Sequence, residues 1–290
     1  MRSNTVFTVV IGVILIIVGA IITFSQDWSK TEEEIARDEA AEKVVSVDAN
    51  DEIKEENIGK VIAVSGKLNR EELLIIDDYS KFGVNTAYLQ RNLEVYQWLK
   101  KCDGDNCEYV KEWSSKIISS EDYDNEHQNP TTWEHQSEEF FDDDAAVGVY
   151  KLSHDVAKKM PLMGTERKNY VGELADGWKQ GYNQYHYFGE IQDNKIGDIR
   201  VKYQFNKEDA EISILAMLDD KGTLVPYEAS NGKEVLVVQE GVFDAKTLLN
   251  AYYRRSRLVI AVYTIFGICL MIAGVSMIIK SFVKKRLAAK

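Results

Sequence analysis

The sequence predicts an α+β membrane protein with a strand-rich ectodomain between an N-terminal and a C-terminal transmembrane helix. Two observations predict the helices: residues 6–24 and residues 258–279 are apolar or weakly polar and contain no charged residue. A third predicts the strands: apolar and polar side chains alternate over several stretches of residues 25–257. A segment of this length suits one or two packed domains.

The second apolar run is the stronger membrane signal. Its 22 residues, at about 1.5 Å per residue, reach across the roughly 30 Å hydrocarbon core of a bilayer. The alternative, a buried helix of a soluble protein, would leave no polar face for water. The first run, of 19 residues, is expected to be an uncleaved anchor. It is longer than the apolar part of a usual signal peptide, the alternative, and no clear Ala-x-Ala cleavage site follows.

The charges predict where the ectodomain lies. The segment between the two runs contains all 47 acidic residues and 29 basic ones, for a net charge of −18. The charged residues of the two flanks, residues 1–5 and the tail at 280–290, are all basic, which places both termini in the cytoplasm. The signal is modest, because three arginines precede the second run and five basic residues follow it. The ectodomain is therefore expected in the periplasm or outside the cell, or in a lumen if the protein is eukaryotic.

Two of the three cysteines, Cys102 and Cys107, bracket the turn-forming sequence Asp-Gly-Asp-Asn. The flanks are rich in aromatic and branched residues and predict a β-hairpin over residues 88–118, in which the two cysteines lie close enough for a disulfide. Such a bond persists outside the cytosol. A pair of free thiols beside a turn is the alternative. The third cysteine, Cys269, is expected to be a small apolar side chain within the second run.

The remaining elements follow from spacing and turn residues. Apolar residues four apart predict a membrane-proximal helix over residues 31–43, and Ser153 and Pro161 bound a short helix. Asp244 is expected to cap a last helix that continues from Ala245 through the second run without a break, so that movement would pass between ectodomain and span. Strands are expected at residues 59–68, 197–205, 211–218, 223–227 and 234–239.

We expect no enzyme, and no metal or cofactor site. The acidic insert at residues 122–144 holds the pairs Glu126-His127 and Glu134-His135, but their spacing does not match H-E-x-x-H, and acidic loops are usually solvated. Two cysteines do not supply four zinc ligands, and the hairpin turn lacks the spacing of a calcium loop. G-x-S-x-G, Walker and dinucleotide motifs are missing. The aromatic cluster at residues 182–188 is expected to pack on a strand, with a binding platform as the alternative. The negative ectodomain disfavours nucleic acid.

Several segments resemble the LUMA (transmembrane protein 43) family. They are Leu89-Gln-Arg-Asn-Leu-Glu-Val-Tyr-Gln-Trp98 before the hairpin, then Glu112-Trp113, Ile118, His127-x-Asn129-Pro130, Gly197-Asp-Ile-Arg-Val201, Leu224-Val-Pro-Tyr227 and Gly241-x-Phe243. Each is short, but their order is specific, and none is catalytic. The resemblance singles out ten motif residues: Glu94, Tyr96, Gln97, Trp98, His127, Asn129, Pro130, Gly197, Asp198 and Arg200.

The resemblance implies a membrane protein with a large lumenal or outer domain that self-associates and acts as a scaffold. Eukaryotic relatives are proteins of the endoplasmic reticulum and inner nuclear membrane that engage emerin and lamins. This chain departs from them, since it has one span near its carboxyl end where they have several, and a very short amino-terminal tail. Emerin or lamin partners are therefore not expected, and a shorter, bacterial relative fits better.

The leading functional hypothesis is a non-enzymatic membrane scaffold that self-associates in the lipid bilayer into a homo-oligomer, through its ectodomain and its spans. Gly12 and Gly19, and likewise Gly267 and Gly274, lie seven residues apart, roughly on one face of each predicted span, where small residues let helices approach. Glycine is also simply common in membrane helices. The alternative hypothesis is a ligand- or partner-sensing ectodomain coupled to the membrane through the last helix. A pore is disfavoured because neither run contains an ionisable residue.

Overall fold

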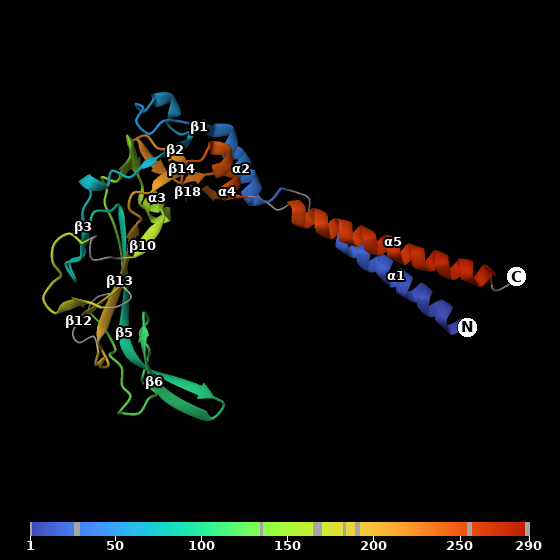
Figure 1. The fold of residues 1–290 in the computed structure, drawn as a ribbon, viewed down its shortest axis with the longest axis horizontal. Helices are drawn as coiled ribbons and strands as arrows, with labels where there is room; N and C mark the ends of the chain where they lie inside the picture. The colour runs from blue at the N-terminus through green and yellow to red at the C-terminus, as the bar shows by residue number, and fades with distance from the viewer. Residues whose placement is uncertain are drawn as a thin grey trace. The chain divides into compact units, whose positions relative to one another are not determined.

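The computed structural model describes residues 2–25, 30–133, 136–164, 170–181, 184–188, 192–253 and 257–287. The chain forms two compact units, Met1–Ile35 with Tyr253–Lys290, and Ala36–Tyr252. The first is a pair of apolar helices and the second is rich in strands (Figure 1). This confirms the predicted fold class.

The helical unit consists of α1 (Arg2–Phe24) and α5 (Arg257–Leu287), which pack side by side in opposite directions (Figure 1). Phe7–Phe24 and Ala261–Val283 are long and apolar enough to cross a membrane, and little of either stretch is buried. Large apolar side chains such as Phe7, Ile21 and Ile272 are more than half exposed, which suits a lipid solvent. α5 continues to Leu287, so most of the predicted basic tail is helical.

The strand-rich unit contains two main sheets. The first has the order β1-β2-β14-β15-β9-β8, and β18 also pairs with β14. Its strands are β1 (Val44–Ser46), β2 (Val61–Lys67), β8 (Ala146–Val147), β9 (Tyr150–Leu152), β14 (Glu211–Leu218), β15 (Thr223–Val225) and β18 (Val237–Glu240).

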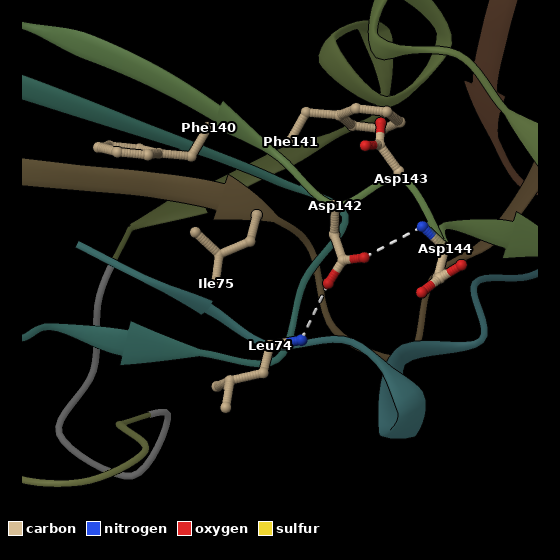
Figure 2. A pocket seen from close by; sticks show the side chains of 7 residues that line it. All are labelled: Leu74, Ile75, Phe140, Phe141, Asp142, Asp143 and Asp144. Carbon is tan, nitrogen blue, oxygen red and sulfur yellow. Dashed lines mark hydrogen bonds between the residues drawn. The ribbon is translucent and has the colours of Figure 1, made fainter. Parts of the chain in front are cut away.

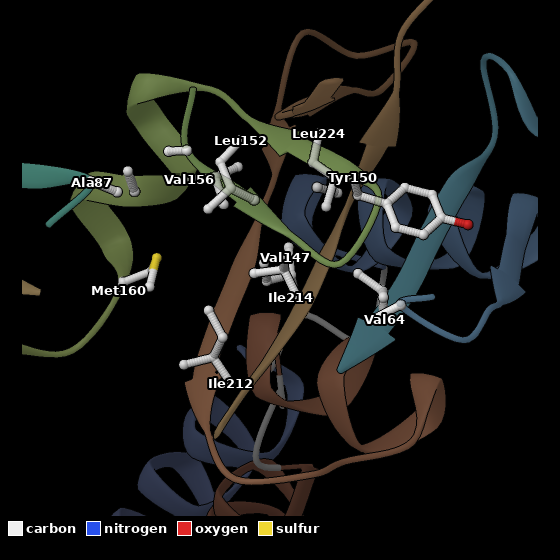
Figure 3. Close-up of a cluster of buried hydrophobic side chains, with 14 of the residues drawn as sticks. Val64, Ala87, Val147, Tyr150, Leu152, Val156, Met160, Ile212, Ile214 and Leu224 are labelled. Atoms are coloured by element: carbon white, nitrogen blue, oxygen red, sulfur yellow. The ribbon is translucent and has the colours of Figure 1, made fainter. Parts of the chain in front are cut away.

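Helices cover both faces of this first sheet, which explains why β14 is buried along almost its whole length. Ile212 and Ile214 point into a core with α3 (His154–Lys159), where Val156 and Leu152 converge on them (Figure 3). On the other face, Leu215 packs in a second core against α2 (Glu32–Lys43) and α4 (Ala245–Tyr252). A strand between two apolar layers reads as a continuous apolar run rather than an alternating one.

The second sheet has the order β11-β12-β13-β5-β6, with β7 paired to β5 and β10 to β13. Its strands are β5 (Tyr88–Asp103), β6 (Asn106–Ser114), β7 (Glu138–Phe141), β10 (Leu162–Gly164), β11 (Trp178–Gln180), β12 (Tyr185–Phe188) and β13 (Ile199–Asn206). Alternate residues of β5 and β13 enter a third core. β13 pairs with β5 only as far as Val95, so the rest of the β5–β6 hairpin projects beyond it (Figure 1).

Small elements complete this unit. They are the two-stranded sheets β3 (Ile75–Ile76) with β4 (Gly83–Val84) and β16 (Tyr227–Glu228) with β17 (Glu234–Val235), and the 3₁₀ turns η1 (Glu55–Asn57) and η2 (Arg70–Glu72).

The last helix differs from its prediction. Asp244 does cap α4, because its Oδ1 accepts the N–H of Thr247 at 2.7 Å. However, α4 ends at Tyr252 and Tyr253 is not helical, so the prediction of one unbroken helix from Ala245 into the membrane is wrong. Periodicity missed this end because no proline or glycine marks it. Ser153 precedes α3 as expected, but its hydroxyl makes no capping bond.

Candidate functional site: the motif residues around strand β5

The ten motif residues come from segments far apart in the sequence and gather around one stretch of β5. β5 pairs with β13 on one edge up to Val95 and with β6 on the other edge from Val95 onward. Beyond Val95, the edge that β13 leaves is closed by other groups. Tyr96 donates its N–H to the carbonyl of Asp198 at 2.9 Å and accepts the N–H of Gly197 at 2.9 Å.

Asn129 continues this edge with its side chain. Its Oδ1 accepts the backbone N–H of Trp98 at 2.6 Å, and its Nδ2 donates to the Trp98 carbonyl at 2.8 Å. The carboxamide thus replaces one residue of a neighbouring strand. One step further along β5, the Tyr123 hydroxyl accepts the N–H of Lys100 at 3.0 Å. Side chains therefore satisfy the backbone where a strand would otherwise be needed.

Gln97 performs the matching task on the core face. This fully buried side chain donates Nε2–H to the carbonyl of Lys116 at 2.9 Å and accepts the N–H of Ile118 at 3.0 Å. These bonds turn the chain away after Ser114, which explains why β6 ends there and not at Ile118 as predicted. Together, Gln97 and Asn129 fix the segment at residues 115–130 to the base of the hairpin.

Charged and aromatic motif residues pack on the opposite face of the sheet. Arg200 donates Nε–H to Glu94 at 2.6 Å, and these residues face each other in the β13–β5 register. The guanidinium lies 4.4 Å from the ring centroid of Trp113 and 4.0 Å from that of Tyr185, within the range of cation–π attraction. These contacts thereby join four neighbouring strands, β12, β13, β5 and β6.

His127 packs against the hairpin rather than facing a substrate cleft. Its ring stacks on Tyr109 with centroids 4.0 Å apart and meets the edge of Trp98 at 4.5 Å. Its Nδ1 lies 2.6 Å from Oδ1 of Asp124, and this hydrogen bond lowers the pKa of that exposed carboxyl. Gly197 has a left-handed φ of 95°, and a Cβ there would lie 3.5 Å from Pro130.

The polar groups of this site are committed to structure. The buried amides bind backbone groups, the charges are paired, and no group of three or more His, Cys, Asp or Glu among the described residues could hold a metal. Glu134 and His135 of one predicted pair lie outside the described residues. The arrangement can fix a hairpin in place, and it offers no general base beside a nucleophile.

We expect Asn129→Ala to lower the free energy of unfolding of the strand-rich unit by about 1–3 kcal/mol. The change leaves the part-buried backbone groups of Trp98 without partners. Chemical denaturation followed by circular dichroism measures the difference. Gln128→Ala is the control, because its bonds to the carbonyls of Tyr123 and Asp124 are exposed and water replaces them. Equal losses in the two variants would contradict the structural role of Asn129.

The hairpin ends in the predicted disulfide between Cys102 and Cys107, which face each other in the β5–β6 register. The surrounding residues at the tip are exposed. Cys269 is free and exposed on α5. Two free thiols at the hairpin, the alternative that the sequence left open, are therefore excluded in this structure.

The four glycines singled out in the spans meet in pairs between α1 and α5. A Cβ on Gly12 would lie 2.8 Å from the carbonyl oxygen of Gly274, and a Cβ on Gly267 would lie 2.7 Å from that of Gly19. Both distances are shorter than real Cβ contacts, so only glycine allows this approach. The glycines thus line a seam within one chain.

A second polar cluster, which was missed from the sequence, lies under the third core. Arg91 and Asp77 form an ion pair with side chains 3% and 1% exposed, so it is shielded from water. Asp77 also accepts the hydroxyl proton of Tyr203, and Arg91 reaches Glu138 at 2.7 Å. Burial, followed by the nearby charge of Asp77, raises the pKa of Tyr203. The sequence did contain one signal for this cluster. Arg91 is a charged residue at a core-facing position of β5, between Leu89 and Leu93.

His186 lies beside this cluster and is fully buried among Phe82, Tyr170 and Tyr203. Its Nε2 contacts the Tyr170 hydroxyl, and its Nδ1 has no hydrogen-bond partner among the described residues. Burial lowers the pKa of His186 to about 4. The imidazole is therefore neutral in the folded protein at neutral pH.

This histidine predicts acid sensitivity. Below the unfolded pKa of about 6.5, the unfolded chain binds a proton that the folded one does not, so stability falls as the pH drops from about 6.5 to about 4. The expected loss is about 3 kcal/mol. We expect His186→Gln to remove most of this loss in denaturation series at pH 7 and pH 4.5. An identical pH dependence in His186→Gln would contradict the assignment.

A shallow pocket of about 460 Å³ lies beside the acidic run that ends the insert (Figure 2). Leu74, Ile75, Phe140 and Phe141 form its apolar part. Asp142 accepts the backbone N–H of Leu74 and that of Asp144, both at 3.1 Å, so this carboxylate shapes the loop.

The remaining matched segments brace other parts of the unit. The Tyr227 hydroxyl donates to Glu39 of α2 at 2.5 Å, and this bond is the main reason that the pKa of Glu39 is lowered to about 2. The backbone N–H of Phe243 donates to Ser213 Oγ at 2.8 Å, just before α4. These contacts are structural too.

Comparison with known proteins finds relatives along most of the chain. The Drosophila melanogaster transmembrane protein 43 homolog is 26% identical over 254 residues, which are 79% of this chain and 65% of that protein. Rat transmembrane protein 43 is 24% identical over 70% of this chain and 56% of its own length, and the human protein is 23% identical over 87% and 68%. The chain thus spans less than two thirds of the first two relatives. No solved structure matches.

The family model described as transmembrane protein 43 matches residues 95–286. The match begins within β5, takes in the hairpin and nine of the ten motif residues, and ends in α5. It covers more than half of the chain. This protein therefore belongs to the transmembrane protein 43 family, and it is an integral membrane protein with a candidate span near each end.

Proposed function

We infer that the protein is a non-enzymatic membrane scaffold that self-associates through its strand-rich unit. The observation that carries the proposal is the convergence of the motif residues on the base of the β5–β6 hairpin. Residues as far apart in the sequence as Glu94 and Arg200 hold the projecting β5–β6 hairpin in a fixed position. Rigid projecting elements of this kind serve protein contacts, because little ordering is needed on binding.

The seam between the spans supports placing the contact in the strand-rich unit. The four glycines that the sequence offered for helix association already lie against each other within one chain. The lipid-facing sides of α1 and α5 carry large apolar side chains instead, such as Ile17 and Phe266. Contact between copies through the spans, the other half of the sequence-based hypothesis, is therefore the weaker route.

We also propose that the strand-rich unit lies outside the cytosol. The disulfide at Cys102 and Cys107 supports this side, because thiols stay reduced in cytosol. The antiparallel spans put both ends of the chain on one side, where the basic residues favour the cytoplasm. Protease added to intact cells, or to sealed vesicles whose outer surface is the non-cytosolic face of the membrane, should cleave the unit without permeabilisation. Cleavage only after permeabilisation would invert the topology.

The alternative hypothesis, a sensing ectodomain coupled to the membrane through the last helix, is not favoured by the end of α4. It required one helix to carry movement from the ectodomain into the membrane, whereas α4 ends at Tyr252.

Self-association is tested on the intact chain extracted in mild detergent. Light scattering after size-exclusion chromatography, with detergent mass subtracted, should give a protein mass of two or more times the 33.0 kDa of one chain. The mass should persist through a tenfold dilution series. A particle of one chain at every concentration would contradict the proposal.

A further inference from the structure

The outer edge of β6 presents a regular row of unused backbone groups. Cys102 and Cys107 lie opposite each other with Cα atoms only 4.1 Å apart, the spacing of a non-hydrogen-bonded antiparallel pair. Such residues direct their N–H and C=O away from the partner strand, and pairs of this kind recur every two residues. The outward residues of β6 are therefore Cys107, Tyr109, Lys111 and Trp113.

The other edge of the hairpin verifies this alternation. The same rule makes Tyr96, Trp98 and Lys100 the outward residues of β5, and these are the residues whose backbone groups bind Asp198, Asn129 and Tyr123. The protein closes that edge with side chains taken from a distant loop. By contrast, no described residue bonds the outward backbone groups of β6, which ends the sheet. An open edge nine residues long is a template for another strand.

We propose that β6 pairs antiparallel with β6 of a second copy of this chain, around a two-fold axis at Val110. The inference rests on the proposed self-association and names its interface. In this register Cys107 pairs with the partner's Trp113 and Tyr109 with the partner's Lys111, so all four outward residues of each strand are used. A shift by two residues in either direction leaves one of the four unpaired. The two-fold arrangement is closed and self-complementary, as homodimer interfaces usually are.

Side chains fit the same register. Within the hairpin, Lys111 already lies 4.7 Å from the ring of Trp98, and Lys100 lies 5.7 Å from that of Tyr109. Pairing Tyr109 with the partner's Lys111 repeats this alternation of cation and aromatic ring across four strands. On the other face, Val110 meets the partner's Val110 beside Leu99, which gives an apolar row at the axis.

One cross-strand pair in this register is unfavourable. Glu108 lies opposite the partner's Glu112, and like charges directly opposite are destabilising. Lys101 offsets the repulsion, since its Nζ is 3.2 Å from Glu112 and the residue faces Glu108 in the hairpin register.

Cross-linking at the axis tests the register. In a Cys269→Ala background, Val110→Cys brings two thiols together in a non-hydrogen-bonded pair, the geometry that Cys102 and Cys107 already have. Mild oxidation of native membranes should convert most of the chain to a covalent dimer. Val149→Cys, exposed on the first sheet's side of the unit, is the control and should stay monomeric. Equal cross-linking of the two variants would overturn the proposal.

A proline pair tests the edge. Lys111→Pro removes an outward N–H and no hairpin bond, and proline is tolerated at such edge positions. Lys111→Ala loses the same side chain but keeps the N–H. We expect the particle mass of the proline variant to fall to one chain and that of the alanine variant to remain that of wild type, both with wild-type melting of the strand-rich unit. Association of the wild type with no effect of Lys111→Pro would overturn this interface alone. A wild type of one chain would overturn the proposed function with it.

Discussion

Replacing Arg91 with methionine is expected to lower the free energy of unfolding of the strand-rich unit by about 3–5 kcal/mol. The change leaves the Asp77 carboxylate, 1% exposed, without its guanidinium in a low-dielectric core. It also removes the bonds from Arg91 to the carbonyl of Gln136 at 2.9 and 3.1 Å. Urea denaturation of the intact chain in detergent, followed by tryptophan fluorescence, measures the effect.

Two variants make this prediction specific. Lys202→Met removes a cation from the outer face of the neighbouring strand and should change stability by less than about 0.5 kcal/mol. The double change Asp77→Asn with Arg91→Met should recover part of the loss, because no uncompensated charge then stays buried. If Arg91→Met is as stable as Lys202→Met, the buried pair is not a major structural element.

Gly274→Leu is expected to force the two spans apart. A Cβ at this position collides with the backbone of Gly12 and the side chain of Ile16, and backbone yields less readily than a flexible side chain. We expect the packing of α1 against α5 to lose about 3 kcal/mol of free energy, which is the upper part of the range for overpacked interiors. Electron–electron distance measurements between spin labels at Ile14 and Ile272, which are lipid-exposed, should show a longer and broader distribution.

The neighbouring residue supplies the control. Ala273 is exposed on the same turn of α5, so Ala273→Leu adds the same apolar volume on the lipid side. Its label distances should match those of the parent chain. A parent-like distribution for Gly274→Leu would mean that the glycine seam does not hold the spans together.

Local patterns sufficed for much of this fold. Two uncharged runs predicted α1 and α5, alternation predicted β13, and the Asp-Gly-Asp-Asn turn predicted the hairpin and its disulfide. Each depends on neighbours within about 20 residues. The spacing of the glycines likewise indicated a packing face, but it could not say that the partner is the other span of the same chain.

The candidate site could not be assembled in the same way. Asn129 acts as part of a strand through its carboxamide, and nothing in its local sequence distinguishes it from a loop asparagine. Arg200 meets Glu94 only because β13 pairs with β5 across more than 100 residues of sequence. The end of α4 at Tyr252 was missed because no terminator marks it, and the partner of Arg91, Asp77, lies in a turn without a periodic pattern.

Counting the copies of this chain in single particles within a bilayer decides whether they assemble. The intact chain, labelled with one fluorophore per copy and reconstituted at low surface density, is bleached while single particles are observed. We expect most fully labelled particles to bleach in two steps and Lys111→Pro particles to bleach in one. Single-step bleaching of wild-type particles would contradict self-association.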